Sequence, residues 1–143
     1  MANITASLVN ELRQRTGVGM MDCKKALVEC DGDMDKAIDY LREKGQKLAA
    51  KRADRDASEG AVLAGVNADK TFAAVIMMNC ETDFVAKNED FVAFTKTVLD
   101  AALAAKAQTM QDVLALEIEG KNVETMIVEQ VAKIGEKITL SHY

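Results

Sequence analysis

The 143-residue sequence contains no proline and no tryptophan, and its aromatic residues are limited to four Phe and two Tyr. Without proline, helix ends have to be set by capping side chains and by glycines. With so few aromatic rings, the core has to be built from aliphatic side chains and methionine. The 49% hydrophobic and 29% charged fractions are typical of a soluble globular chain that forms one ordinary domain or two small ones.

The residues on which most enzymes depend are also scarce. The single histidine is His142, and the sequence has no GxSxG, no glycine-rich phosphate loop, no HExxH and no pair of CxxC motifs. Cys80 is flanked by Asn79 and Glu81, which bring no positive charge to stabilise a thiolate, so a buried cysteine at a strand end is expected there. Scattered cysteines and one histidine match no metal-ligand spacing. We therefore expect no catalytic residue, no metal and no cofactor.

The cysteines and the charge balance restrict location and partners. Cys23, Cys30 and Cys80 form no CxxC pair and the N-terminus lacks a secretory signal, so reduced thiols in the cytoplasm are expected. No apolar run has membrane-spanning length. Residues 1–55 hold 11 Lys and Arg against 9 Asp and Glu, whereas residues 56–143 hold 7 against 14. This acidic second half argues against direct nucleic-acid binding.

Helical spacing of apolar residues dominates the start of the chain. Three such stretches predict a three-helix domain over residues 1–45, the first helix running from Asn3 to Arg15. Asp33 is expected to cap the third helix, and Gly45 is expected to end it. The polar, alternately charged residues 46–58 predict a basic linker that either continues the helix or is flexible.

From residue 59 the spacing changes from helical to extended. Two apolar runs, at residues 61–66 and 71–78, flank a polar turn and predict a β-hairpin. Further helices are expected downstream, and residues 137–143 form a candidate third strand. The sequence therefore predicts an α+β protein, whose second domain over residues 59–143 is a hairpin packed by helices.

The boundaries of the later helices follow from their capping residues. Asn88 is expected to begin a long helix, Thr109 a short one, and Asn122 the last one. Gly135 is expected to end that last helix.

Two stretches suggest a binding surface. Met20 and Met21 are adjacent at a helix start, about 100° apart, so we expect at least one to be exposed as an adaptable contact. The alternative is that both cover the small bundle. Phe84 lies in a polar junction between a strand and a helix, where an aromatic side chain makes a natural interface anchor. The alternative is that it folds back onto the hairpin.

Three motifs resemble one known family. ITASLVNELRQRTGVGMMDCKKAL (residues 4–27), NCETDFVAKNEDF (residues 79–91) and VAKIGEKI (residues 131–138) resemble signatures of the elongation factor Ts family, in that family's order and approximate spacing. They are spread from residue 4 to residue 138 and so span nearly the whole chain.

The resemblance implies a ubiquitin-associated-like three-helix domain followed by the N-terminal subdomain of the family's core. It implies that the partner is elongation factor Tu, both GDP-bound and nucleotide-free, and that the first domain docks on its nucleotide-binding domain. The Thr-Asp-Phe-Val loop would then disturb the magnesium and phosphate site, so that GDP leaves. The implied partner-binding residues are Met20, Met21, Thr82, Asp83, Phe84, Val85, Ile134, Gly135 and Glu136.

Members of that family typically continue beyond the position of Tyr143. A truncated or naturally short homologue is therefore expected, with an incomplete core subdomain. The strand edge near residue 140 would then be unpaired and open to self-association.

Two other functions are open at this point. A module that binds a nascent polypeptide could use the same surface, residues 17–22, but would leave Phe84 without a role. A thiol-dependent enzyme at Cys80 would lose its activity on Cys80→Ser, whereas an exchange factor would lose little beyond stability.

Overall fold

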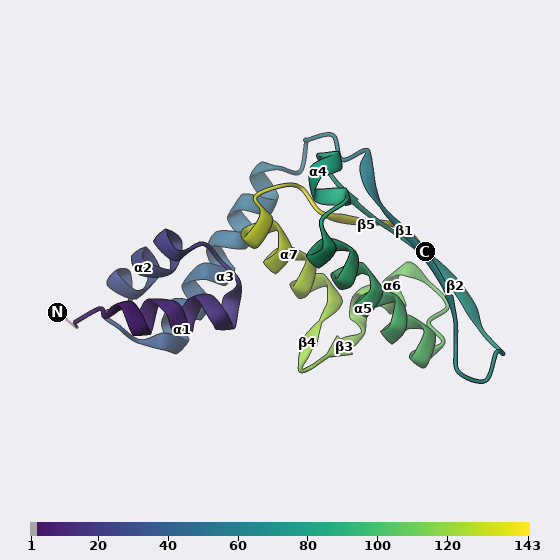
Figure 1. Cartoon of the computed structure of the whole chain (residues 1–143), viewed down its shortest axis with the longest axis horizontal. Coiled ribbons are helices and arrows are strands. Elements are labelled where there is room, and N and C mark those ends of the chain that lie inside the picture. Colours follow the sequence, from purple (N-terminus) through teal and green to yellow (C-terminus); the bar gives the residue numbers. More distant parts are fainter. Residues whose placement is uncertain (1–2) are drawn as a thin grey trace. The chain divides into compact units, whose positions relative to one another are not determined.

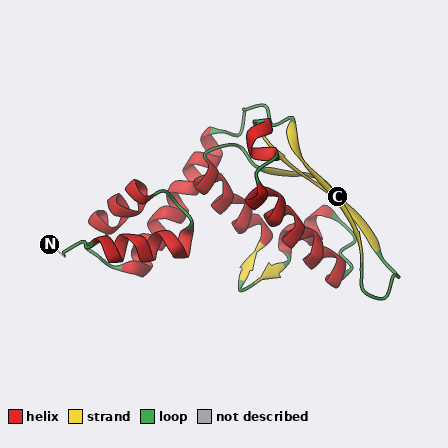
Figure 2. Ribbon diagram, in the orientation of Figure 1, coloured by secondary structure: helices red, strands yellow, loops and turns green. Residues whose placement is uncertain are grey.

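The computed structural model describes residues 3–143. The chain forms two compact units, the first holding the chain up to Ala53 together with Val128–Gly135, and the second holding Asp54–Ile127 with Glu136–Tyr143. Helices and strands are mixed along the chain (Figure 2), and the predicted α+β class is confirmed.

The first unit begins with three helices (Figure 1), namely α1 (Ala6–Thr16), α2 (Met20–Glu29) and α3 (Met34–Lys51). The start expected at Asn3 was too early, because the Thr5 hydroxyl caps α1 by accepting from the backbone N–H of Leu8 at 3.2 Å. Gly17, at φ +69°, ends α1 in the left-handed region that favours glycine. The three helices enclose an aliphatic core of Val9, Leu12, Val18, Cys23, Ala26, Leu27, Ala37 and Leu41.

Gly45 does not end the third helix, which was a wrong prediction. Helix α3 continues to Lys51, so the helical alternative for the first part of the expected linker is confirmed. Gly45 is buried, and a Cβ placed on it would lie 2.9 Å from the Cβ of Ala132 in α7 (Val123–Ile134). The glycine therefore serves the close approach of two helices and not a chain reversal.

We predict that Gly45→Ala destabilises the first unit, although alanine is the better helix former by about 1 kcal/mol. The added methyl group has to push α3 and α7 apart, and such overpacking costs about 1–3 kcal/mol. Urea unfolding measures the change. Adding Ala132→Gly should restore much of the lost stability, and a double variant as unstable as the two single losses combined would contradict the packing argument.

The second unit is built on a β-hairpin. Strand β1 (Glu59–Val66) pairs antiparallel with β2 (Ala73–Cys80), so the predicted hairpin is confirmed. Strand β5 (Thr139–His142) pairs antiparallel with β2 and confirms the third strand. The sheet order β1-β2-β5 leaves β5 with one paired neighbour among residues 3–143, and self-association along its other edge stays a prediction.

Helix α5 (Glu89–Ala105) packs against the hairpin (Figure 1). It leaves no room for a side chain at Gly65, where a Cβ would lie 2.8 Å from Cδ1 of Leu103. Ile76 and Met78 of β2 and Phe91 of α5 are buried in this unit. Its remaining elements are α4 (Asp83–Ala86), α6 (Met110–Ala115) and the two-residue strands β3 (Glu117–Ile118) and β4 (Lys121–Asn122).

The expected caps are confirmed. Asn88 Oδ1 accepts from the backbone N–H of Asp90 at 2.9 Å, Thr109 forms a capping box with Asp112, and Asn122 Oδ1 accepts from the N–H of Thr125 at 2.8 Å. In the part of the chain that the structure describes, no helix is long and apolar enough to cross a bilayer.

The ribbon between α6 and α7 was not predicted. Strands β3 and β4 reverse at Glu119 and Gly120, which both have positive φ. Glu-Gly is not among the residue pairs that signal a tight hairpin turn, so the sequence carried little warning of it.

Candidate functional site

The segment that leaves β2, residues 81–86, carries the most exposed aromatic ring of the described chain; we call it the Phe84 turn. Phe84 is 83% exposed, whereas Phe91 and Phe94 of the next helix are buried. The alternative in which Phe84 folds back onto the hairpin is therefore wrong. Exposing a large apolar ring costs hydration free energy, so this position is suited to binding another molecule.

Thr82 gives the Phe84 turn its helical shape. Its backbone is extended at φ −119°, and its hydroxyl accepts from the N–H of Val85 at 3.4 Å, which makes it the N-cap of α4. The Sγ of Cys80 donates to the carbonyl oxygen of Thr82 at 3.2 Å. Asp83 and Lys87 form an exposed ion pair at 3.2 Å across α4, which adds little stability.

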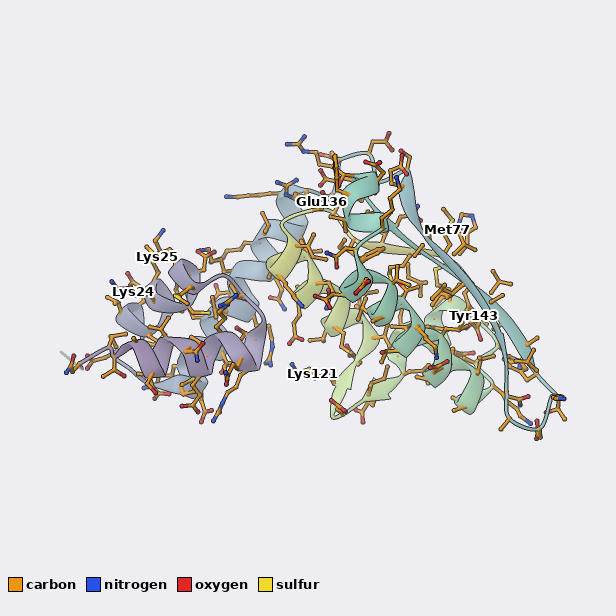
Figure 3. The ribbon with its side chains drawn as sticks, viewed as in Figure 1. Lys24, Lys25, Met77, Lys121, Glu136 and Tyr143 are labelled. Atoms are coloured by element: carbon orange, nitrogen blue, oxygen red, sulfur yellow. The ribbon has the colours of Figure 1, made fainter. Side chains whose placement is uncertain are left out.

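Glu136, which is labelled in Figure 3, is hydrogen-bonded to the start of the Phe84 turn. Its Oε1 accepts from the backbone N–H groups of Glu81 and Thr82, both at 3.0 Å. Its Oε2 accepts from the Thr82 hydroxyl at 2.7 Å. In return, Oε1 of Glu81 accepts from the backbone N–H of Lys137 at 2.7 Å. Two carboxylates thus join the end of β2 to the segment that precedes β5.

The end of α7 is formed as expected. Gly135 has φ +81° and its N–H donates to the carbonyl oxygen of Val131 at 2.8 Å, so it ends the helix that Ile134 completes. Ile134 is partly buried. Both residues belong to the first unit, whereas Glu136 belongs to the second.

Met20 and Met21 open helix α2 in the first unit. They are 51% and 65% exposed, so the alternative in which both cover the bundle is wrong. The neighbouring Asp22 pairs with Lys44 of α3 at 2.7 Å, which links the start of α2 to the third helix. The two thioethers therefore form an apolar, adaptable surface on a short helix whose other face is packed.

The surroundings of Cys80 do not support thiol chemistry. Burial, and then the negative charge of Glu136, raise the pKa of the Cys80 thiol to about 11. The thiol is therefore protonated at neutral pH, and a thiol is a poor nucleophile. Within residues 3–143, no three His, Cys, Asp or Glu side chains are grouped so as to hold a metal ion.

We predict that alkylation by iodoacetamide at neutral pH modifies Cys30 first, because its side chain is partly exposed while Cys23 and Cys80 are buried. Cys80 should react only as the protein unfolds, since both access and the raised pKa protect it. Peptide mass spectrometry over time measures this order. Cys80 reacting as fast as Cys30 in the folded protein would contradict it.

Sequence reasoning missed part of this site. The carboxylate of Glu81 lies within the motif NCETDFVAKNEDF but was not among the predicted residues. Helix α4 was also missed, because its single turn has no apolar period of its own. Thr82 with Val85 three residues later was the available signal, since threonine is a preferred N-cap.

The comparisons with known proteins agree with one another. The family model described as Elongation factor TS matches residues 81–143. Elongation factor Ts of Amoebophilus asiaticus is 56% identical over 140 residues, which are 98% of this chain and 50% of that protein. Elongation factor Ts of Christiangramia forsetii is 53% identical over 143 residues, 100% of this chain and 52% of that protein. That of Rhodopirellula baltica is 54% identical over 142 residues, 99% of this chain and 43% of that protein.

Proposed function

The chain is homologous over its whole length to elongation factors Ts, and we propose that it binds elongation factor Tu and promotes the release of GDP in translation elongation in the cytoplasm. It spans about half the length of the curated relatives that it matches. The proposed action is protein–protein contact and involves no bond chemistry in this chain.

The observation that carries the proposal is the exposed ring of Phe84 on a turn whose backbone is tied down. Burying such a ring against a partner is worth roughly 1.5–3 kcal/mol. The backbone on its N-terminal side is held through Thr82 and Glu136, so little conformational entropy remains to be lost on binding. An aromatic anchor of this kind is typical of the residues that dominate interface energies.

The release step follows from linkage. A Mg²⁺ ion in the partner neutralises the phosphate charge of GDP. A wedge that displaces the partner residues around this ion therefore weakens GDP binding without contacting the guanine base. If this chain binds the nucleotide-free partner more tightly than the GDP-bound one, it must also weaken GDP binding to the partner. The ratio by which it does so equals the ratio by which GDP weakens binding of this chain to the partner. In this proposal Phe84 is the wedge, and Asp83 and Val85 contact the partner beside it. Ile134 and Gly135, at the end of α7, are further proposed partner contacts.

Met20 and Met21 supply the second contact, on the nucleotide-binding domain of the partner. Their exposure supports a docking surface that is independent of the Phe84 turn. The same surface would also suit a module that binds a nascent polypeptide, but that function leaves Phe84 without a role.

We predict that Phe84→Ala removes most of the acceleration of GDP release. Elongation factor Tu loaded with a fluorescent GDP is mixed with excess unlabelled GDP, and release is followed with and without this chain. Loss of the ring, which is buried only when the partner binds, should slow the accelerated release by roughly tenfold or more. Val66→Ala, which shortens an exposed apolar side chain at the end of β1, is the matched control and should act like the parent. A folded parent chain that neither binds the partner nor accelerates release would reject the exchange function and favour the polypeptide-binding module.

We predict a different defect for Met20→Ala combined with Met21→Ala. Removing both thioethers should weaken binding of elongation factor Tu by about tenfold, since each contributes apolar contact area. Release at saturating concentrations of the chain should change much less. Titration of the release rate against chain concentration separates the two parameters, and a loss confined to the saturating rate would contradict the docking role.

A further inference from the structure

The carboxylate of the partly buried Glu136 is hydrogen-bonded to the Phe84 turn, although the family resemblance placed this residue among the partner contacts. We propose that Glu136 is a positioning residue, which fixes the Phe84 turn in its binding shape and acts on the partner only through that turn. This inference rests on the proposed exchange function and assigns a separate task to one residue of the same site.

Both carboxylate oxygens of Glu136 are already engaged. Oε1 accepts two backbone N–H groups, those of Glu81 and Thr82, and Oε2 accepts the Thr82 hydroxyl. A carboxylate has about four acceptor positions, and three are used within the turn. A direct contact with the partner is left with the one remaining acceptor position, unless it displaces one of these charge-assisted bonds, which are stronger than bonds between neutral groups.

The bond to the Thr82 hydroxyl determines how α4 begins. A hydroxyl has one proton, and here it points at Oε2 of Glu136. The oxygen lone pairs are therefore free to accept the N–H of Val85, which caps α4. Phe84 lies between the cap and the capped residue. The carboxylate of Glu136 thus orients the Thr82 hydroxyl, and the hydroxyl caps the first turn of α4. The backbone of that turn in turn determines the direction of the Phe84 ring.

A second carboxylate, that of Glu81, ties the same two segments together in the opposite direction. Glu81 accepts the N–H of Lys137, one residue beyond Glu136, so the two segments exchange bonds in both directions. The left-handed backbone of Gly135 leads the chain into Glu136. Cys80 adds a bond to the carbonyl oxygen of Thr82 from the strand itself. The backbone of the turn is held on several sides, while the ring of Phe84 stays exposed.

The first test measures how well the backbone of the Phe84 turn is held in the absence of the partner. Amide hydrogen exchange followed by NMR reports on the N–H groups of Glu81, Thr82 and Val85 in the full chain. Glu136→Ala should speed exchange at these amides by roughly tenfold or more, since each loses a bond made to, or ordered by, a charged group. Glu124→Ala removes an exposed carboxylate from the first turn of α7 and is the matched control, with no change expected at the turn.

Glu136→Gln is the conservative variant and guards against an alanine variant that fails to fold. Its amide oxygen still accepts the two backbone N–H groups, but its amide nitrogen donates to the Thr82 hydroxyl. That reversed bond occupies one of the two lone pairs that could accept from the N–H of Val85, and it weakens the cap. Protection at Glu81 and Thr82 should therefore be largely kept, while the Val85 amide should exchange faster than in the parent.

The second test is a double-mutant cycle in the GDP-release assay. Glu136→Ala alone should slow accelerated release by roughly tenfold, and the Gln variant should recover part of that loss. In a Phe84→Ala background, Glu136→Ala should have little further effect, because there is no ring left to position. A residue that touches the partner itself would show the same fold loss in both backgrounds.

The two tests separate the possible failures. Multiplying losses in the cycle would overturn the positioning role, and so would unchanged amide exchange in both Glu136 variants. A parent chain without exchange activity would reject the proposed function, and with it the action of Glu136 on release. The amide data would then show only whether the carboxylate holds the turn.

Discussion

The functional part of this structure depends on carboxylates that take the place of missing sheet hydrogen bonds. When β2 ends, the N–H groups of Glu81 and Thr82 lose the ladder partners that strand residues have. A partly buried amide without an acceptor costs free energy, so the chain must satisfy it locally or leave it to water. Oε1 of Glu136 accepts from both amides, and Oε1 of Glu81 accepts from the single amide of Lys137. The backbone at these strand ends therefore has hydrogen-bond acceptors although the ladder has stopped.

This arrangement has an electrostatic consequence for the neighbouring thiol. Cys80 is buried at the end of β2, and the negative charge of Glu136 adds to the effect of desolvation on its pKa. The carboxylate that stabilises the turn therefore also suppresses thiolate formation beside it. Burial and the charge of Glu136 thus act in the same direction and keep the Cys80 thiol protonated.

How much could be predicted from the sequence depended on the range of each interaction. The hairpin, the caps at Asn88, Thr109 and Asn122, and the glycine at the end of α7 are local features, and they were predicted correctly. Gly45 was misassigned, because a glycine that admits another helix and a glycine that ends one look alike in sequence. The bonds between Thr82 and Glu136 join positions 54 residues apart, and no periodicity reports such a pairing. The polar neighbours of Phe84 suggested an interface anchor but left the packed alternative open, and the carboxylates that hold its turn could only be seen in the folded chain.

The two proposed contact surfaces, Met20 with Met21 and the Phe84 turn, differ in rigidity, and this difference suits the two tasks that we propose for them. Met20 and Met21 are flexible side chains at a helix start, which adapt to a partner at some entropic cost and favour affinity over geometry. Phe84 has only two side-chain torsions and sits on a backbone tied to its neighbours through Thr82. If the Phe84 turn were flexible, contact with the partner's nucleotide site would move the turn and not the residues of the partner. A ring on a clamped turn transmits its binding energy to the partner. For this reason the rigidity given by Glu136 should matter more for release than for attachment.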